Sequence, residues 1–279
     1  MEASAAKPTR VITPPRGWHL PNLRELWEYR DLGYFLVKRD VSIRYRQTLV
    51  GTIWAILQPL ILAGVFTLFL GYLNKVHSTA QVPYAVFAVT GMAMWLYFSQ
   101  AMALASESTV QSRELIAKVW FPRLLIPIAA VIPPALDFIP AFGVALIVMF
   151  AYGIFPPLQI MLVPFLVLLT LATALGLGLW LSALNVRYRD VRIVVPFVIQ
   201  IGLFITPIVY PLQSVPKSAQ PFYAINPMVG VLETYRWMLF PHAQAPGLLV
   251  LIPIASALIL LVTGAIYFNH AERDFADVI

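Results

Sequence analysis

Between Asp137 and Arg187 the chain runs for 49 residues without a lysine, arginine, aspartate or glutamate. A helix crosses a bilayer core of roughly 30 Å with about 20 residues, because it rises about 1.5 Å per residue. The uncharged stretch is therefore long enough for two crossings and a tight connection, which we place at Phe155–Pro157. A segment of this kind cannot face water along its length, so we predict an integral membrane protein.

The whole chain has the composition of a membrane domain. Of its 279 residues 60% are hydrophobic and 11% are charged, whereas soluble domains have about 25% charged residues. Its length accommodates about six spanning helices and no additional soluble domain. The absence of cysteine excludes disulfides, thiolate metal sites and cysteine nucleophiles. The predicted fold class is an all-α membrane protein with six transmembrane helices, forming a transmembrane domain over residues 48–270.

Six windows of low charge mark the predicted spans. They are Gly51–Leu73, a window within Pro83–Ser106, Leu124 to about Tyr152, about Leu158 to Leu184, Ile193 to about Leu212, and Leu248–Phe268. Prolines inside a span are expected to kink it, because each removes a backbone hydrogen bond that a neighbour must replace. The prolines concerned are Pro59, Pro133, Pro134, Pro164 and Pro196.

The basic residues fall mostly on one side of these spans. An even number of spans places both termini on one side, and that side has 16 of the 19 lysines and arginines; the other has Lys75, Lys217 and Arg236. The positive-inside rule therefore places both termini in the cytoplasm. The net charge of +6 follows from this topology and needs no nucleic-acid partner.

Three segments lie outside the predicted spans at the two ends of the chain. Residues 1–22 are polar and proline-rich without a signal-peptide core, and they are predicted to be a retained, disordered cytoplasmic tail. Residues 23–47 are charged and aromatic, and their apolar face rotates past Gly33, so we expect two short helices along the inner leaflet. A solvated linker is equally compatible with this pattern. Residues 271–279 are predicted to be a cytoplasmic C-terminal tail.

The connection between the second and third spans, Ser112–Arg123, mixes charges with large apolar side chains. A loop that only reverses the chain does not need such side chains, so they indicate docking on another protein. Packing on the inner leaflet is the alternative. Pro122 is expected to end the helix. The apolar residues recur at helical spacing and are Leu115, Ile116, Val119 and Trp120.

The segment between the fifth and sixth spans, Ile225–Phe240, has the signals of an external amphipathic helix. Asn226 is a favoured N-cap, and Pro227 suits the first helical position. Glu233 and Arg236, three residues apart, share the polar face and are placed to pair. The apolar face consists of Met228, Val231, Leu232, Tyr235, Met238 and Leu239.

A second, shorter helix is expected to begin near residues 215–218, just before this one. The resulting hairpin is too polar to span and too amphipathic to be unstructured. We expect it to dip into the outer leaflet, where it would gate an exit or anchor the fold.

Asp137 is the one acid well inside a predicted span. A carboxylate there costs a few kcal/mol unless it is paired or hydrated, so it either carries protons and faces a conduit or hydrogen-bonds a neighbouring helix. Aromatic rings within the spans either line a conduit that sugar rings traverse or pack between helices. The candidate conduit residues are Trp95, Phe98, Asp137, Phe197, Phe204 and Tyr210.

Sequence motifs for catalysis are missing. There is no G-x-x-x-x-G-K-[ST] phosphate loop, no G-x-S-x-G and no H-E-x-x-H. The four histidines are scattered without metal-ligand spacing. We therefore predict no catalytic residue, no metal site and no cofactor on this chain.

Five segments in register resemble the ABC-2 type permeases of polysaccharide exporters, which are type V exporter-like. The resemblance covers nearly the whole chain from about Leu23. These permeases export O-antigen, capsular and teichoic-acid polymers. The segments are Arg44–Gly51 with Trp54, Gln58 and Pro59; Lys118–Arg123; Leu184–Val191; Thr206–Tyr210; and Ile225–Met228.

The resemblance implies a homodimer in the bacterial inner membrane that encloses a conduit for a lipid-linked glycan. It implies a separate nucleotide-binding ATPase in two copies, which would hold ATP and Mg. Residues 112–121 would be the coupling helix, with contacts from Arg113, Glu114, Leu115, Ile116, Lys118, Val119, Trp120 and Phe121. Residues 216–240 would form periplasmic gate helices, with key residues Asn226, Pro227, Glu233, Tyr235 and Arg236.

Three functions are compatible with these observations. The leading hypothesis is the permease subunit of an ATP-driven glycan exporter, which is not itself an enzyme. An ion-coupled secondary transporter would use Asp137 as its titrating group, and inverted repeats that would support it are not seen. A membrane enzyme acting on a lipid-linked sugar is disfavoured, because the loops have no paired carboxylates or acidic metal cluster.

Overall fold

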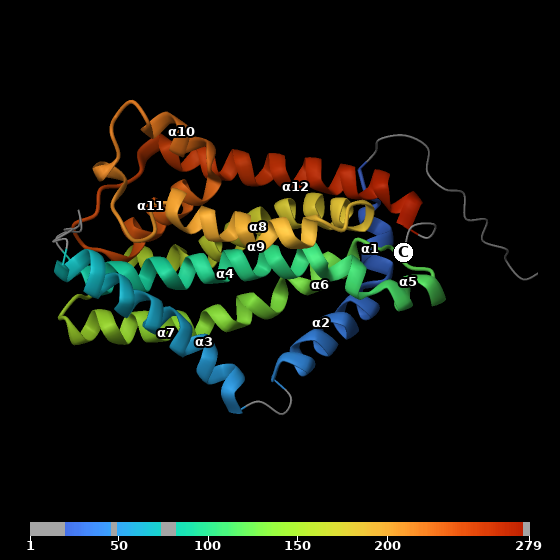
Figure 1. The fold of residues 1–279 in the computed structure, drawn as a ribbon, viewed down its shortest axis with the longest axis horizontal. Helices are drawn as coiled ribbons and strands as arrows, with labels where there is room; N and C mark the ends of the chain where they lie inside the picture. Colours follow the sequence, from blue (N-terminus) through green and yellow to red (C-terminus); the bar gives the residue numbers. More distant parts are fainter. Residues whose placement is uncertain (1–19, 46–48, 74–81, 276–279) are drawn as a thin grey trace, which may run out of the picture.

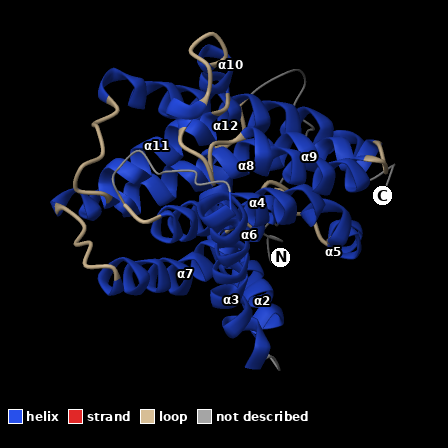
Figure 2. Cartoon of the chain, turned by 60° about the vertical axis from the view of Figure 1, so that its left-hand side comes forward, coloured by secondary structure: helices blue, strands red, loops and turns tan. Residues whose placement is uncertain are grey.

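The computed structural model describes residues 20–45, 49–73 and 82–275. The predicted tail 1–22 therefore lies outside the described residues except for its last three, and the predicted tail 271–279 is described as far as Phe275. Over the described ranges the regular structure is helical, without strands, as Figure 2 shows. This confirms the all-α prediction.

Two long helices form the centre of the bundle. They are α4 (Tyr84–Gln111) and α8 (Val163–Arg187), which pack along each other. α12 (Leu251–Ala271) packs on the outer side of α8, whereas α7 (Ile132–Ala151) and α3 (Leu49–Phe66) pack on α4 (Figure 1). α4 is the most deeply enclosed of the long helices, because other helices surround it.

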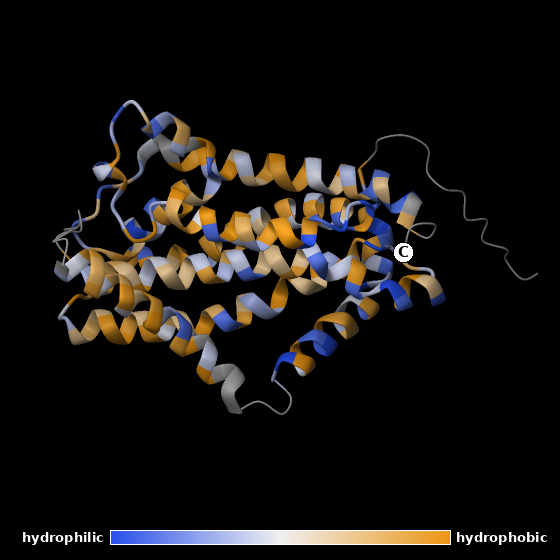
Figure 3. Ribbon diagram, viewed as in Figure 1, coloured by the Kyte–Doolittle hydropathy of each residue, from blue (hydrophilic) through white to orange (hydrophobic). Residues whose placement is uncertain are grey.

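Within the described ranges, four helical segments are long and apolar enough to cross a membrane: Tyr84–Gln111, Leu125–Ala151, Leu158–Arg187 and Leu251–Ala271. Figure 3 shows that hydrophobic residues dominate the middle of the bundle and hydrophilic residues gather at its ends. The other two predicted spans are shorter apolar helices over Ile56–Tyr72 and Val191–Ile205. Six crossings therefore remain a prediction.

The proline-containing spans differ in detail from the predictions. α9 (Val191–Ile205) ends about seven residues before the predicted end at Leu212, because Thr206 precedes Pro207 and a residue before proline is disfavoured in the helical region. The third span is divided into α6 (Leu125–Ala130) and α7, just ahead of Pro133. Pro164 lies in the first turn of α8 and therefore starts this helix instead of kinking it.

The N-terminal region contains two helices, as predicted. α1 (Leu23–Glu28) is capped by Asn22, whose side chain accepts a hydrogen bond from the Arg24 amide at 3.1 Å, and α2 (Arg30–Tyr45) follows directly. The break falls at Tyr29 and not at Gly33, which lies within α2 close to the Leu125 side chain. α2 and α3 project together from one side of the bundle (Figures 1 and 2).

Short helices mark the two ends of the molecule. α1, α5 (Arg113–Lys118) and the C-terminal end of α12 lie at one end, and α10 (Gln220–Ile225) and α11 (Pro227–Leu239) lie at the other (Figure 1). The remaining elements are a π-helix at Thr67–Leu73 and 3-10 turns at Leu158–Leu162, Leu212–Ser214, Gly247–Val250 and Glu272–Asp274.

Candidate functional site

The helix predicted over 112–121 is shorter in the structure. α5 ends at Lys118, and Val119 is extended with φ −135° and ψ 137°, so Pro122 does not end the helix. Two side chains predicted to dock on a partner are instead buried: Ile116 and Phe121 pack with Leu36 of α2. Their burial joins α5 to the N-terminal helices.

The rest of this segment is exposed. Val119 and Trp120 are about half exposed, and the Trp120 ring contacts Tyr29 edge to face at 5.9 Å. Glu114 and Lys118 lie 3.9 Å apart on the exposed side of α5. We call the exposed part the coupling surface, which consists of Arg113, Glu114, Lys118, Val119 and Trp120, with Leu115 half buried behind it.

The first residues of the predicted C-terminal tail, as far as Phe275, pack on the bundle at the same end. The Arg123 backbone N–H donates to Glu272 Oε1 at 3.3 Å, and Arg123 Nη1 donates to the Glu272 carbonyl oxygen at 2.5 Å. Burial raises the pKa of Glu272, and Arg123 opposes this shift. Phe275 is fully buried, with its ring 5.3 Å from that of Phe268.

Asp137 is bonded to a neighbouring helix, which is the second of the two alternatives given for it in the sequence analysis. It lies in the second turn of α7, where its carboxylate forms an ion pair with Arg44 and accepts a hydrogen bond from the Tyr45 hydroxyl, both at the end of α2. Arg44 Nη2 also donates to Gln100 Oε1 at 2.6 Å, and Gln100 Nε2 donates to Gln58 Oε1 at 3.4 Å. These five residues form the Asp137 cluster, which joins α2, α3, α4 and α7.

Burial raises the pKa of Tyr45 to about 12, and the hydrogen bond to Asp137 adds to the shift. The hydroxyl therefore stays protonated and remains a donor at neutral pH. The sequence did contain a signal for this cluster. A lone acid within a span needs a partner, and Arg44 lies just before the first predicted span. Which of the many arginines is the partner depends on the fold.

The candidate conduit rings do not come together within one chain. Trp95 and Phe98 are buried with ring centroids 5.6 Å apart, and Trp95 lies directly against Gly202 of α9. Phe197 and Phe204 are about 60% exposed on α9. The first two rings are therefore packing residues, whereas the second two face outward.

Tyr210 connects the end of α9 to the hairpin formed by α10 and α11. Its hydroxyl donates to the Phe204 carbonyl at 2.8 Å and lies 3.2 Å from the Tyr223 hydroxyl of α10. Asn226 caps α11 as predicted, because its Oδ1 accepts from the Met228 amide at 3.0 Å, and its Nδ2 donates to Thr206 Oγ1 at 2.9 Å. Pro227 is the first residue of α11.

Arg236 pairs with Glu233 at 2.7 Å, as predicted, but it is not on an exposed face. The guanidinium is buried, and Nη2 donates to the carbonyl oxygens of Pro207 and Ile208 at 2.6 and 2.9 Å. The Cζ atom of Arg236 lies 4.0 Å from the Phe87 ring centroid. Burial lowers the pKa of Arg236, and Glu233 opposes this shift.

The reason for this burial is the unwound chain after α9. Carbonyl groups that leave a helix need new donors, and a planar guanidinium supplies several at fixed angles. Tyr235, on the adjacent face, is fully buried between the rings of Phe138 and Phe142, at 6.4 and 6.3 Å. α11 is thus held on the bundle from both faces.

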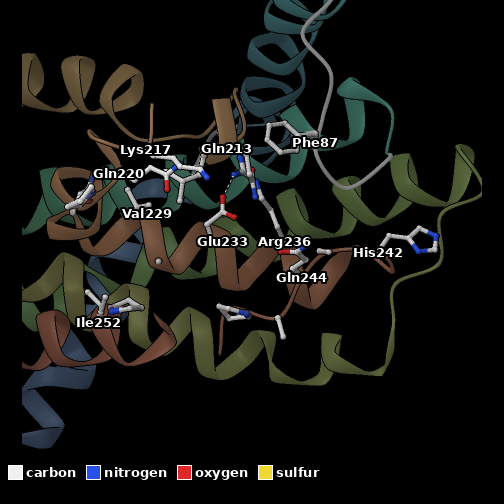
Figure 4. Close-up of a pocket in the computed structure, with 18 residues that line it drawn as sticks. Phe87, Gln213, Lys217, Gln220, Val229, Glu233, Arg236, His242, Gln244 and Ile252 are labelled. Carbon is white, nitrogen blue, oxygen red and sulfur yellow. Dashed lines mark hydrogen bonds and ion pairs between the residues drawn. The ribbon is translucent and has the colours of Figure 1, made fainter. Parts of the chain in front are cut away.

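Two cavities lie at opposite ends of the bundle. One of about 460 Å³ lies between α2 and the end of α4, with Arg39 and Arg44 in its lining. The other, the hairpin cavity, has about 630 Å³ and is shown in Figure 4. It lies among α10, α11, the start of α12 and the flanking loops, and its polar lining includes Gln213, Lys217, Gln220, Glu233, Arg236 and Gln244.

No group of three or more histidines, aspartates or glutamates is placed to hold a metal ion within residues 20–45, 49–73 and 82–275. The arrangement offers binding surfaces and interhelical links.

Comparison with known proteins gives one family and several full-length relatives. The model of the ABC-2 type transporter family matches residues 32–240. The O-antigen export system permease protein RfbA of Myxococcus xanthus is 29% identical over 92% of this chain and 98% of its own length. RfbA of Klebsiella pneumoniae is 26% identical over 89% and 95%, and the polysialic acid transport protein KpsM of Escherichia coli is 25% identical over 85% and 92%.

Proposed function

The chain belongs to the ABC-2 type transporter family, and we propose that it is the membrane-spanning permease of an ATP-driven exporter of a lipid-linked polysaccharide. The observation that supports this most strongly is the similarity over nearly the whole length of both chains to permeases named for O-antigen export. The multi-pass helical bundle provides the membrane domain such a function needs.

The energy source would be a separate ATPase, present in two copies on a homodimer of this chain. The sequence has no phosphate loop of its own, so ATP and Mg would be held by that partner. The coupling surface suits this role, because Val119 and Trp120 are apolar, exposed and flanked by the charges of α5. Exposed apolar groups among charges are typical of protein interaction sites.

The contacts behind the coupling surface offer a mechanical route into the bundle. Ile116 and Phe121 pack on Leu36, so a displacement of α5 moves α2. α2 ends at the Asp137 cluster, which contacts three further helices. Such a two-state shift of packed helices is a known mode of coupling. The Asp137 carboxylate is ion-paired here, and we therefore propose it as a linker and not as a proton carrier.

The orientation follows from the distribution of basic residues. With both termini in the cytoplasm, the hairpin of α10 and α11 faces the periplasm across the inner membrane and acts as the exit gate, residues 216–240. Phe197 and Phe204 face outward from one chain, and we place them at the conduit between two protomers. Trp95 and Phe98 are buried behind α9, the helix that has these two residues, because Trp95 lies against Gly202 and Phe98 packs on Trp95.

The test is reconstitution with the proposed partner ATPase. We expect ATP-dependent export of the glycan, and we expect the double substitution Val119→Glu and Trp120→Glu to reduce export at least tenfold by weakening ATPase binding. ATPase pull-down and export are measured together.

Trp120→Phe is the matched control, because it keeps an apolar ring and should export within twofold of wild type. Ile116→Ala should lower thermal stability instead, since Ile116 is buried against α2. Normal export and pull-down by the double variant would rule out the coupling surface, and export without ATP would rule out the transport mechanism.

A further inference from the structure

The hairpin cavity contains polar groups that the proposed transport mechanism does not use. Its volume of about 630 Å³ lies within the range of about 300–1,000 Å³ typical of small-molecule sites. Figure 4 shows Lys217, Gln213 and Gln220 on one side, facing Glu233 and Arg236 of α11, with His242 set apart.

The cavity has one positive charge that no acid neutralises. Glu233 is the one carboxylate in its described lining, and it is paired with Arg236 at 2.7 Å. Arg236 also donates hydrogen bonds to two backbone carbonyl oxygens. Lys217 is exposed and makes no hydrogen bond or ion pair within the described part of the chain. A concave site with an uncompensated cation concentrates anions.

Side-chain amides surround this charge. Gln213 and Gln244 make no side-chain hydrogen bond to any described residue, and Gln220 uses its Nε2 to donate to the Val215 carbonyl at 3.1 Å, which leaves its Oε1 free. An amide both donates and accepts hydrogen bonds, which matches the hydroxyl groups of a sugar.

The floor of the cavity is apolar and firmly packed. Val229, Gly230 and Pro253 form part of it, and a Cβ at Gly230 would lie 2.7 Å from Pro253 Cγ, so α11 and the start of α12 are in direct contact. An apolar floor with a few convergent polar groups is the usual composition of a ligand site. A sugar ring has the complementary character, with C–H faces and a polar edge.

We propose that the hairpin cavity binds an acidic sugar unit of the exported glycan, one that bears a carboxylate or a phosphate. Lys217 pairs with the acidic group, the three glutamines bind hydroxyls, and the ring lies on the floor of Val229 and Pro253. This inference rests on the proposed function, which supplies the glycan and places the cavity on the outer face. Binding there holds the emerging polymer at the exit.

The experiment measures ligand binding by the full chain in nanodiscs of zwitterionic lipid, without the ATPase. The probes are a trisaccharide of glucuronic acid, mannose 6-phosphate, the neutral maltotriose and inorganic phosphate. We expect at least one acidic sugar to bind at least tenfold more tightly than maltotriose. Lys217→Gln should weaken that binding about tenfold, whereas Lys217→Arg should retain it within threefold.

Lys38→Gln is the matched control, because it removes one positive charge from an exposed residue of α2 outside the hairpin cavity and should leave binding unchanged. Lys217 is exposed, so its variants should fold, and a monodisperse gel-filtration profile checks this. Failure of both acidic sugars to bind, equal binding of maltotriose, or an unchanged affinity in Lys217→Gln would overturn the proposal. Displacement of the sugar by inorganic phosphate at equal affinity would do so too, since it shows an anion site that does not recognise sugar.

These outcomes are separate from those of the transport test. Sugar binding without ATP-dependent export would overturn the proposed function and leave the cavity assignment standing. Export by a chain that binds no acidic sugar would overturn the cavity assignment alone.

Discussion

At the scale of single residues, buried polar groups connect segments that are far apart in sequence. Asp137 joins α7 to the end of α2, and Arg236 joins α11 to the unwound chain after α9. Each charge is paired and hydrogen-bonded, which is the condition under which a charge is tolerated away from water. These residues therefore determine how the ends of the bundle are attached to it.

Asp137→Asn should lower the free energy of unfolding by about 1.5–3 kcal/mol, the range for a hydrogen bond to a charged group. The asparagine oxygen still accepts from Tyr45, but the attraction to Arg44 is lost. Thermal unfolding of the purified protein measures the effect, and the combination with Arg44→Gln should be less than additive.

Export by Asp137→Asn should remain dependent on ATP and independent of a pH gradient. If the substitution abolished export while leaving the thermal stability unchanged, Asp137 would act on the transported species and not as a structural link.

At the scale of elements, glycines allow close approach of α8 and α12. A Cβ at Gly176 would lie 2.6 Å from the Leu261 nitrogen, and one at Gly264 would lie 2.5 Å from the Gly176 carbonyl oxygen. The same interface has Trp180 stacked on Tyr267 at 4.3 Å. Small residues at helix crossings are a general means of association in membranes, where packing replaces the hydrophobic effect.

Gly264→Ala should therefore destabilise the bundle by about 1–3 kcal/mol, because overpacking forces the two backbones apart. Gly143→Ala is the matched control: it lies in α7 with no atom within 4 Å of the new Cβ, and removing a helical glycine should be neutral or stabilising by up to about 1 kcal/mol. Thermal unfolding of both variants is compared. Equal shifts would contradict the close crossing of α8 and α12.

At the scale of the whole molecule, the two ends of the bundle have different candidate binding sites. The end with α5 and the docked C-terminal residues has the exposed coupling surface, and the end with α10 and α11 has the hairpin cavity. A transporter that works between two compartments needs such a division. The proposed topology states which end faces which compartment.

The chain has no cysteine, so single cysteines report topology directly. Ser218→Cys, beside the hairpin cavity, should react with a membrane-impermeant maleimide in intact spheroplasts. Glu114→Cys, on the exposed side of α5, should react only after the membrane is permeabilised. The unsubstituted chain is the control for background labelling. Labelling of both positions from the same side would contradict the proposed orientation.

Local patterns predicted the elements well. The apolar windows correspond to helices, Asn226 and Pro227 begin α11, and Glu233 pairs with Arg236 at a spacing of three. These features depend on residues a few positions apart, whose relative placement is fixed by helix geometry. The early end of α9 was also visible in principle, since Thr206 precedes Pro207, but the hydrophobic pattern continues beyond this point.

The sequence by itself determined that this is an apolar helical protein with its basic residues on one side, because charge-free length and charge asymmetry are properties of the chain. Only the tertiary structure decided that Arg44 and Tyr45 pair with Asp137 and that Ile116 and Phe121 turn inward. It also decided that Arg236 is buried, whereas Lys217 has no partner among the residues that the structure describes. Those outcomes depend on which helices pack together, and the periodicity of a helix specifies that it has a buried face without specifying its neighbour.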